Sequence, residues 1–180
     1  MILDATAGNR TLWINKESEN IIYIDMETQL EVKPTIFCKN DMTPFRDKLF
    51  DTILYDPPHT WGGTDHYHCY PRRTQEYIEK WKDTAIPRYY GWDKYKSETE
   101  LIMHIVKAQQ EFQRILKDDG LLWLKWNEMS IPLYKILSLL NGWRLMIKIH
   151  DKDPSQTAGK HKTYWLCMEK ILRSGAQLTL

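Results

Sequence analysis

Short apolar runs alternate with longer amphipathic stretches along the chain, which is the pattern of a sheet protein with helical connections. The runs that predict strands are residues 1–3, 21–24, 35–38, 51–55, 121–125, 143–149 and 163–168. Residues 98–117 place apolar side chains at helical spacing, so they predict a long helix that Gly120 would end. Shorter helices are expected over residues 131–140 and 11–17.

This order of elements predicts an α/β fold with a Rossmann-like, doubly wound and mostly parallel sheet in three α/β/α layers. An antiparallel C-terminal hairpin would complete the sheet. A length of 180 residues fits a single domain over residues 1–180. The periodicity breaks down at residues 60–97, which we expect to form an inserted lid that contacts the target.

Composition narrows the class of protein only slightly. The formal net charge of +1 gives no overall sign of nucleic-acid binding, so any basic surface must be local. The three cysteines show no C-x-x-C spacing, which indicates a reduced protein. Because the sequence has neither a signal peptide nor an apolar stretch of membrane-spanning length, we expect a cytoplasmic protein without a membrane contact.

The most informative stretch is Asp56-Pro57-Pro58-His59, which follows the apolar run at residues 51–55. Two prolines donate no backbone hydrogen bonds and fix φ near about −65°, so the strand must leave the sheet there. The turn then presents a carboxylate, rigid carbonyls and a flat ring where open α/β sheets bind ligands. Such a turn can hold a flat group that bears an amine, although a purely structural turn explains it about as well when it is read alone.

Three further acids, Asp4, Asp25 and Asp41, also come at or near the ends of predicted strands. A single Asp at such a position is usually a helix cap or a turn residue. Four carboxylates beside one cleft would repel one another unless they met donors or a cation. We therefore expect a polar binding site at this edge of the sheet.

Two of these stretches resemble motifs of the class I S-adenosylmethionine-dependent methyltransferases, in the branch that methylates amino groups of nucleic-acid bases. Asp4-Ala5-Thr6-Ala7-Gly8-Asn9-Arg10-Thr11 looks like that branch's first-strand loop, D-P-F-A-G-S-G-T. Asp56-Pro57-Pro58-His59 looks like its catalytic [DNS]-P-P-aromatic motif. The chain departs from the pattern at Arg10, where the family usually has a second glycine, and at His59, where Tyr, Phe or Trp is commoner.

The resemblance implies S-adenosylmethionine as the cofactor. Asp4 and the loop around Gly8 would hold its methionine end, and Asp25 would accept hydrogen bonds from the ribose hydroxyls, as acids there do in dinucleotide folds. Asp41 would accept from the adenine amine, with Met42 against the ring. The implied cofactor-binding residues are Asp4, Ala7, Gly8, Asn9, Asp25, Met26, Asp41 and Met42.

The double-proline turn would then hold the target. Asp56 and the Pro57 carbonyl would accept the N–H bonds of an exocyclic amine and orient its lone pair toward the methyl donor. His59 would hold the base flat, after the base has been flipped from a helix or taken from a single strand. The implied catalytic residues are Asp56, Pro57, Pro58 and His59, and the chemistry requires no metal.

Within the inserted segment, Trp61, Arg72 and Arg73 are candidate substrate-binding residues, because charge beside aromatic planes is typical of single-strand binding. A solvated lid packed on its own domain explains them equally well. His66 and His68 suggest a metal site, but no second pair of ligands follows for tetrahedral closure, so we expect ordinary loop residues.

The sequence therefore predicts an S-adenosylmethionine-dependent methyltransferase that acts on a nucleobase amine in DNA or RNA. We expect no separate target-recognition domain, so specificity would be low, would follow RNA shape or would need a partner subunit. Two alternatives stay open: methylation of a protein amide or small-molecule amine by the same turn, and a catalytically inactive fold that serves as a binding subunit. Arg10 favours the inactive fold, whereas Asp25 and Asp56 oppose it.

Overall fold

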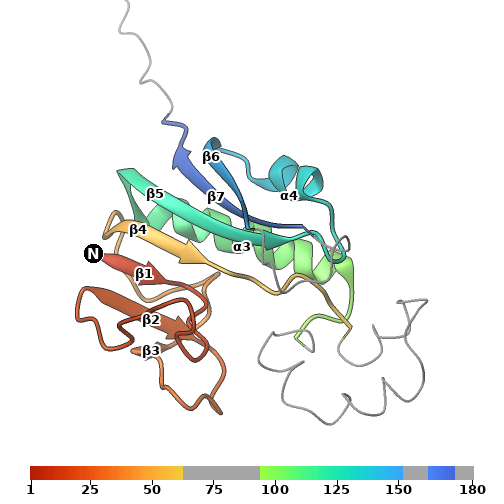
Figure 1. Ribbon diagram of the computed structural model, residues 1–180. Coiled ribbons are helices and arrows are strands. Elements are labelled where there is room, and N and C mark those ends of the chain that lie inside the picture. Colours follow the sequence, from red (N-terminus) through yellow and green to blue (C-terminus); the bar gives the residue numbers. More distant parts are fainter. Residues whose placement is uncertain (63–93, 152–161, 173–180) are drawn as a thin grey trace, which may run out of the picture.

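A computed structural model describes residues 1–62, 94–151 and 162–172. Its centre is a seven-stranded sheet in the order β3-β2-β1-β4-β5-β7-β6 (Figure 1). The strands are β1 (Ile2–Asp4), β2 (Ile21–Asp25), β3 (Ile36–Phe37), β4 (Phe50–Tyr55), β5 (Leu116–Asn127), β6 (Trp143–Asp151) and β7 (Thr163–Lys170). The strands from β3 to β5 are parallel, and β7 runs antiparallel between β5 and β6. This confirms the predicted mostly parallel sheet with an antiparallel C-terminal hairpin.

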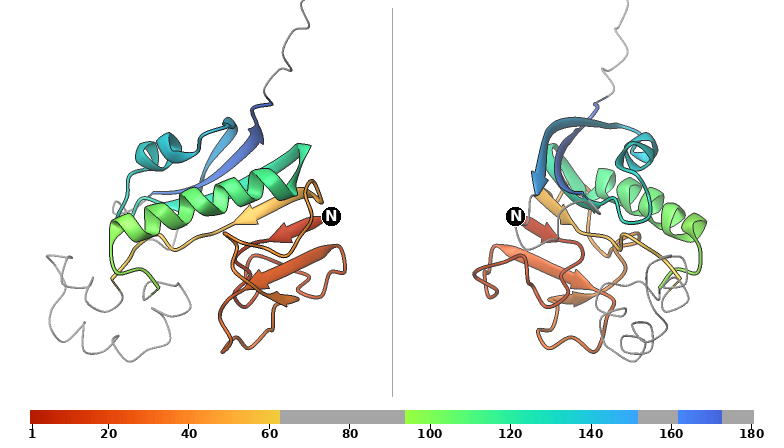
Figure 2. Two further views of the ribbon diagram at one scale, coloured as in Figure 1. Left: turned by 180° about the vertical axis from the view of Figure 1, so that it is seen from behind. Right: turned by 45° about the vertical axis from the view of Figure 1, so that its right-hand side comes forward.

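The described helices lie against one face of this sheet (Figure 2). They are α3 (Glu98–Ile115) and α4 (Leu133–Leu139). Ser97 caps α3, because its hydroxyl accepts a hydrogen bond from the Glu100 N–H at 3.2 Å. The buried stripe of α3 packs on the sheet, and the Phe112 ring meets the Tyr55 ring edge-on at 4.9 Å between centroids. No helix in the described ranges is long and apolar enough to cross a membrane.

Gly120 does not end the long helix, as the sequence predicted, because α3 ends at Ile115 and β5 begins with the next residue. Gly120 instead lies within β5. A Cβ there would come 2.7 Å from the Leu116 side chain and 3.0 Å from the Asp51 carbonyl oxygen. The missing side chain therefore permits a close approach of β5 to β4 and has no capping role.

The helix predicted over residues 11–17 is wrong, since the structure has turns there. The Trp13 indole N–H donates to Asp4 Oδ2 at 2.7 Å, and the Arg10 guanidinium donates to the Lys16 carbonyl. These tertiary bonds fix the segment, whereas so short a helix would gain too few bonds to offset its nucleation. The predicted second helical layer is consequently not seen among the residues that the structure describes.

Candidate functional site

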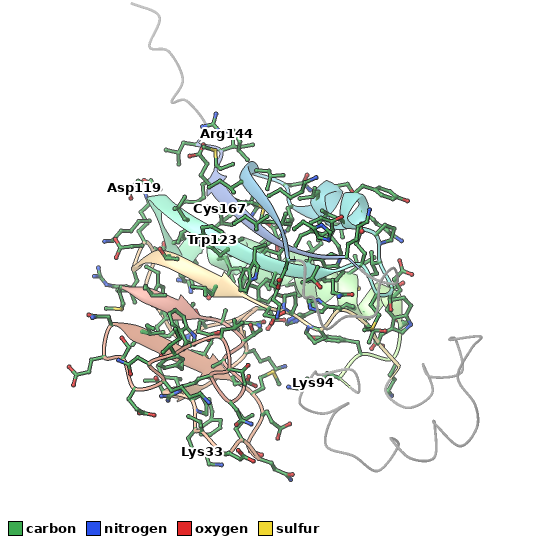
Figure 3. All side chains as sticks on the ribbon, viewed as in Figure 1. Lys33, Lys94, Asp119, Trp123, Arg144 and Cys167 are labelled. Atoms are coloured by element: carbon green, nitrogen blue, oxygen red, sulfur yellow. The ribbon has the colours of Figure 1, made fainter. Side chains whose placement is uncertain are left out.

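A cavity of about 460 Å³ opens beyond the carboxyl ends of β1, β2 and β4, where open α/β sheets bind their ligands. Its volume suits a small ligand. The loop half of its lining comprises Ala5, Thr6, Ala7, Gly8, Asn9, Thr11, Leu12, Asp25, Met26, Leu30, Cys38 and Asn40. The turn half comprises Asp56, Pro57, Pro58, His59, Lys94, Tyr95, His104 and Lys125. In Figure 3, Lys94 marks this end of the sheet, and Asp119 and Arg144 mark the opposite end.

Backbone hydrogen bonds hold the first loop across the strand ends. The Ala5 N–H donates to the Leu54 carbonyl at 2.8 Å, and the Ala7 N–H donates to the Ile24 carbonyl at 3.1 Å. Gly8 has a φ of +49°, which favours glycine, and a Cβ there would meet no atom within 4 Å. The loop therefore presents bare backbone to the cavity.

Asp25 ties this loop to the end of β2. Its Oδ2 accepts from the Gly8 N–H at 2.9 Å, and its Oδ1 accepts from the Glu27 N–H at 2.8 Å. A carboxylate offers about four acceptor positions, so acceptor capacity remains on the cavity side. Asp25 and Gly8 thus lie together in the cavity wall, and their contact with a cofactor stays a prediction.

Arg10, which stands where the family pattern has a second glycine, adopts a backbone conformation that favours glycine. Its φ is +53°, which is uncommon for a residue with a side chain. The buried guanidinium donates to the carbonyls of Lys16 and Lys33, the latter at 2.6 Å, and lies 4.0 Å from the Tyr23 ring centroid. These contacts compensate for the backbone strain, so the loop retains its shape.

Asp4 does not line the cavity, because it lies behind the first loop with 1% exposure. Its carboxylate accepts from the Trp13 indole at 2.7 Å and from the Thr6 N–H at 3.2 Å. Burial raises the pKa of Asp4 to about 6, against the opposing effect of these hydrogen bonds. The structure thus gives Asp4 a place beneath the loop, and direct contact with a cofactor stays a prediction.

The structure also places Asp41 and Met42 outside the cavity lining. Asp41 Oδ2 lies 3.6 Å from His104 Nδ1, and the Met42 side chain is 73% exposed. The neighbouring Asn40 lines the cavity instead. Its amide N–H₂ donates to the Ala5 carbonyl at 3.0 Å, while its Oδ1 is buried and has no partner among the described residues. An unpaired buried acceptor at this position suits a ligand amine.

The turn half centres on Asp56, whose two carboxylate oxygens contact different basic side chains. Oδ1 lies 3.2 Å from His59 Nε2, and Oδ2 lies 3.0 Å from Lys125 Nζ. Burial raises the pKa of Asp56, but the hydrogen bonds and charges of His59 and Lys125 outweigh it and leave the pKa below its usual value. Asp56 is therefore a carboxylate at neutral pH.

A contact with the Trp126 ring holds the His59 ring in place, in addition to its contact with Asp56. Its ring meets Trp126 at 5.1 Å between centroids, with 82° between the planes. Its Nδ1 is buried and has no partner among the described residues. Stacking of His59 on a base stays a prediction.

Sequence reasoning missed Lys125, Tyr95, His104 and Asn40 as members of this site. For Lys125 a signal existed, since it is a charged residue near the carboxyl end of an apolar strand. Trp61 packs partly buried against the hydrophobic core and does not line the cavity. Arg72, Arg73, His66 and His68 lie outside the described residues. Within the described ranges, no group of three His, Cys, Asp or Glu residues could hold a metal ion.

Comparisons with known proteins support the fold independently. No protein-family model matches the chain, and no curated protein matches it in sequence. Among solved structures, it is similar to a TehB-like SAM-dependent methyltransferase from Corynebacterium glutamicum, with a TM-score of 0.52, 12% identity and coverage of 94% of this chain and 79% of the other. A SAM-dependent methyltransferase from Methanosarcina mazei also gives a TM-score of 0.52 at 12% identity, with coverage of 96% and 92%. A Pyrococcus horikoshii protein gives 0.53 at 10% identity, with coverage of 94% and 81%. The chain therefore has the class I fold of S-adenosylmethionine-dependent methyltransferases.

Proposed function

We propose that this protein is an S-adenosylmethionine-dependent N-methyltransferase that acts on an exocyclic amine of a nucleobase in DNA or RNA. The observation that carries the proposal is the Asp56-Pro57-Pro58-His59 turn, which lines the same cavity as the Gly8 loop and Asp25. The groups proposed to hold the amine and those proposed to hold the cofactor therefore line one cavity.

The loop half suits the cofactor, which supplies a methyl group activated on a sulfonium when it is bound. Asp25 retains acceptor capacity for ribose hydroxyls after its bonds to Gly8 and Glu27. Gly8 leaves open space where a Cβ would stand, so a ligand can approach the backbone. Asn40 Oδ1, which has no partner among the described residues, would accept from the adenine amine.

The turn half suits the amine. The lone pair of an aromatic amine is delocalised into its ring, so the amine is a poor nucleophile. Acceptors on its N–H bonds, supplied by Asp56 and the Pro57 carbonyl, favour the form in which charge develops and orient the lone pair. Asp56 or water would take the proton that the amine loses when it accepts the methyl group, whose bond to the sulfonium sulfur would break as its bond to nitrogen forms.

The test is methyl transfer from labelled S-adenosylmethionine to single-stranded DNA, single-stranded RNA and total protein, followed by digestion of the nucleic acid to nucleosides. The proposal expects label on an N-methylated nucleoside. Label confined to protein would favour amide methylation by the same turn. Absence of both transfer and cofactor binding would indicate the inactive binding subunit.

A further inference from the structure

Among the residues that the structure describes, Lys125 is the lysine that contacts the Asp56 carboxylate, and it does so from the neighbouring strand β5. It lies near the carboxyl end of β5, next to β4 in the sheet, and its Nζ is 3.0 Å from Asp56 Oδ2. The side chain lines the cavity and is 25% exposed. Asp56 is its only hydrogen-bond partner within the described part of the chain. An ammonium has three N–H donors, so two of them have no acceptor among the described residues, and the Trp165 ring centroid lies 5.8 Å from Nζ.

This arrangement places a donor directly beside an acceptor on the cavity wall. The group complementary to it is an N–H donor beside an acceptor, which is the N=C–NH₂ edge of adenine (N6 and N1) and of cytosine (N4 and N3). On the Watson–Crick edge of guanine the amine instead stands beside the N1–H donor, which would face the ammonium. On its other side the guanine amine neighbours N3, which lies close to the sugar.

We propose, on the basis of the proposed function, that Lys125 is a specificity-determining residue that donates a hydrogen bond to the ring nitrogen beside the target amine. The substrate class is thereby narrowed to adenine or cytosine. Asp56 accepts a hydrogen bond from the amine and Lys125 donates one to the ring nitrogen, so the two side chains together recognise both atoms of one base edge. A ligand acceptor also compensates the loss of water around the partly exposed ammonium when the base enters.

A merely supporting role for Lys125 has a different consequence. If Lys125 only held Asp56 in place, its loss would slow methylation of every base to the same degree. If it also reads the ring nitrogen, its loss must remove the discrimination against a base in which that nitrogen is replaced by C–H.

The experiment compares kcat/KM on single-stranded oligonucleotides that carry adenine or 1-deazaadenine, and cytosine or 3-deazacytosine. The quantity compared is the ratio of kcat/KM for the parent base to kcat/KM for its deaza analogue. We expect this ratio to be about tenfold to a hundredfold larger in wild type than in Lys125→Met. The deaza change alters the intrinsic reactivity of the amine equally for both enzymes, so this comparison removes it. Lys125→Arg, which keeps a donor, should retain the wild-type ratio.

Lys148→Met is the matched control, because Lys148 is an exposed lysine of β6 outside the cavity lining, 5.7 Å from the Tyr164 ring centroid. It should keep the wild-type ratio. Equal ratios in wild type and Lys125→Met, or methylation of guanine by wild type, would overturn the inference while leaving the proposed function standing. Should Lys125→Met fail to fold, a loss of discrimination in Lys125→Arg would equally contradict it. Absence of transfer to any nucleic acid by wild type would overturn both.

Discussion

The two halves of the cavity are built in different ways. In the loop half, side chains form hydrogen bonds with the backbone. Asp25 accepts from two backbone N–H groups and Asn9 accepts from two more. Arg10 donates to two backbone carbonyls. In the turn half, side chains hold one another, since His59 and Lys125 both meet Asp56. The loop half therefore has a shape set by the chain path, whereas the turn half can exchange partners when a substrate enters.

This difference suggests a division of labour. A ligand that is the same in every turnover needs a fixed site, and bonds to backbone provide one. A target that must be selected and then released needs donors and acceptors that change partners. The predictions below each change a residue of one half and measure its effect on stability, cofactor binding or methyl transfer.

The largest expected effect on stability concerns the support beneath the loop half. The pKa of Asp4 has its ordinary value of 3.8 in the unfolded chain, and burial raises it to about 6 in the folded protein. Its contribution to stability is therefore greatest below its unfolded pKa and is lost as the pH rises through about 6. The difference in free energy of unfolding between wild type and Asp4→Asn should fall by about 2 kcal/mol between about pH 4 and pH 7.

Urea unfolding at both pH values measures this change. Asp51→Asn is the control, because hydrogen bonds from Lys117 and the N-terminus lower the pKa of the exposed Asp51 to about 2, which has the opposite sign. If the difference in free energy of unfolding between wild type and Asp4→Asn did not change with pH, the pKa of Asp4 would not be raised in the folded protein.

The next effect concerns the fixed acceptor of the loop half. Asp25→Ala should weaken S-adenosylmethionine binding by about tenfold to a hundredfold, because acceptors for the ribose hydroxyls and the bond to Gly8 are both lost. Calorimetry measures the Kd directly. Glu27→Ala, which removes a half-buried carboxylate outside the cavity lining, should bind as wild type does. Equal binding by Asp25→Ala and wild type would remove the loop half from the cofactor site.

The smallest effect separates the strain at Arg10 from its contacts. Arg10→Ala and Arg10→Gly both lose the guanidinium bonds to Lys16 and Lys33, but only glycine adopts a φ of +53° without strain. Both should be less stable than wild type, and the glycine variant should be more stable than the alanine variant by about 1 kcal/mol. Thermal unfolding of the pair tests this order, and an alanine variant at least as stable would deny the strain.

Much of the fold could be predicted from the sequence, because it depends on short-range patterns. The alternation of apolar runs gave the strands, and Ser97 followed by acids marks the start of α3. The predictions of local structure were wrong where contacts with residues distant in sequence determine the conformation. The segment at 11–17 lacks a helix because Trp13 and Arg10 bind groups elsewhere, and Gly120 serves a contact with β4.

The candidate site divides in the same way. Asp25 and Asp56 could be placed beside one cavity, because parallel strands end at one edge of a sheet. The positions of Asp4 and Asp41 could not, since Trp13 and His104 determine where those carboxylates lie. Lys125 is 69 residues from Asp56 in sequence, so only the pairing of β4 with β5 brings the two together.

The most direct test of the whole account measures cofactor binding and methyl transfer on one preparation of Asp56→Ala. We expect S-adenosylmethionine to bind with the wild-type Kd and transfer to nucleic acid to fall by about a hundredfold to a thousandfold. Asp51→Ala, which removes an exposed carboxylate from the strand that ends just before Asp56, should match wild type in both measurements. Full transfer by Asp56→Ala, or loss of cofactor binding in step with transfer, would contradict the separation of the two halves.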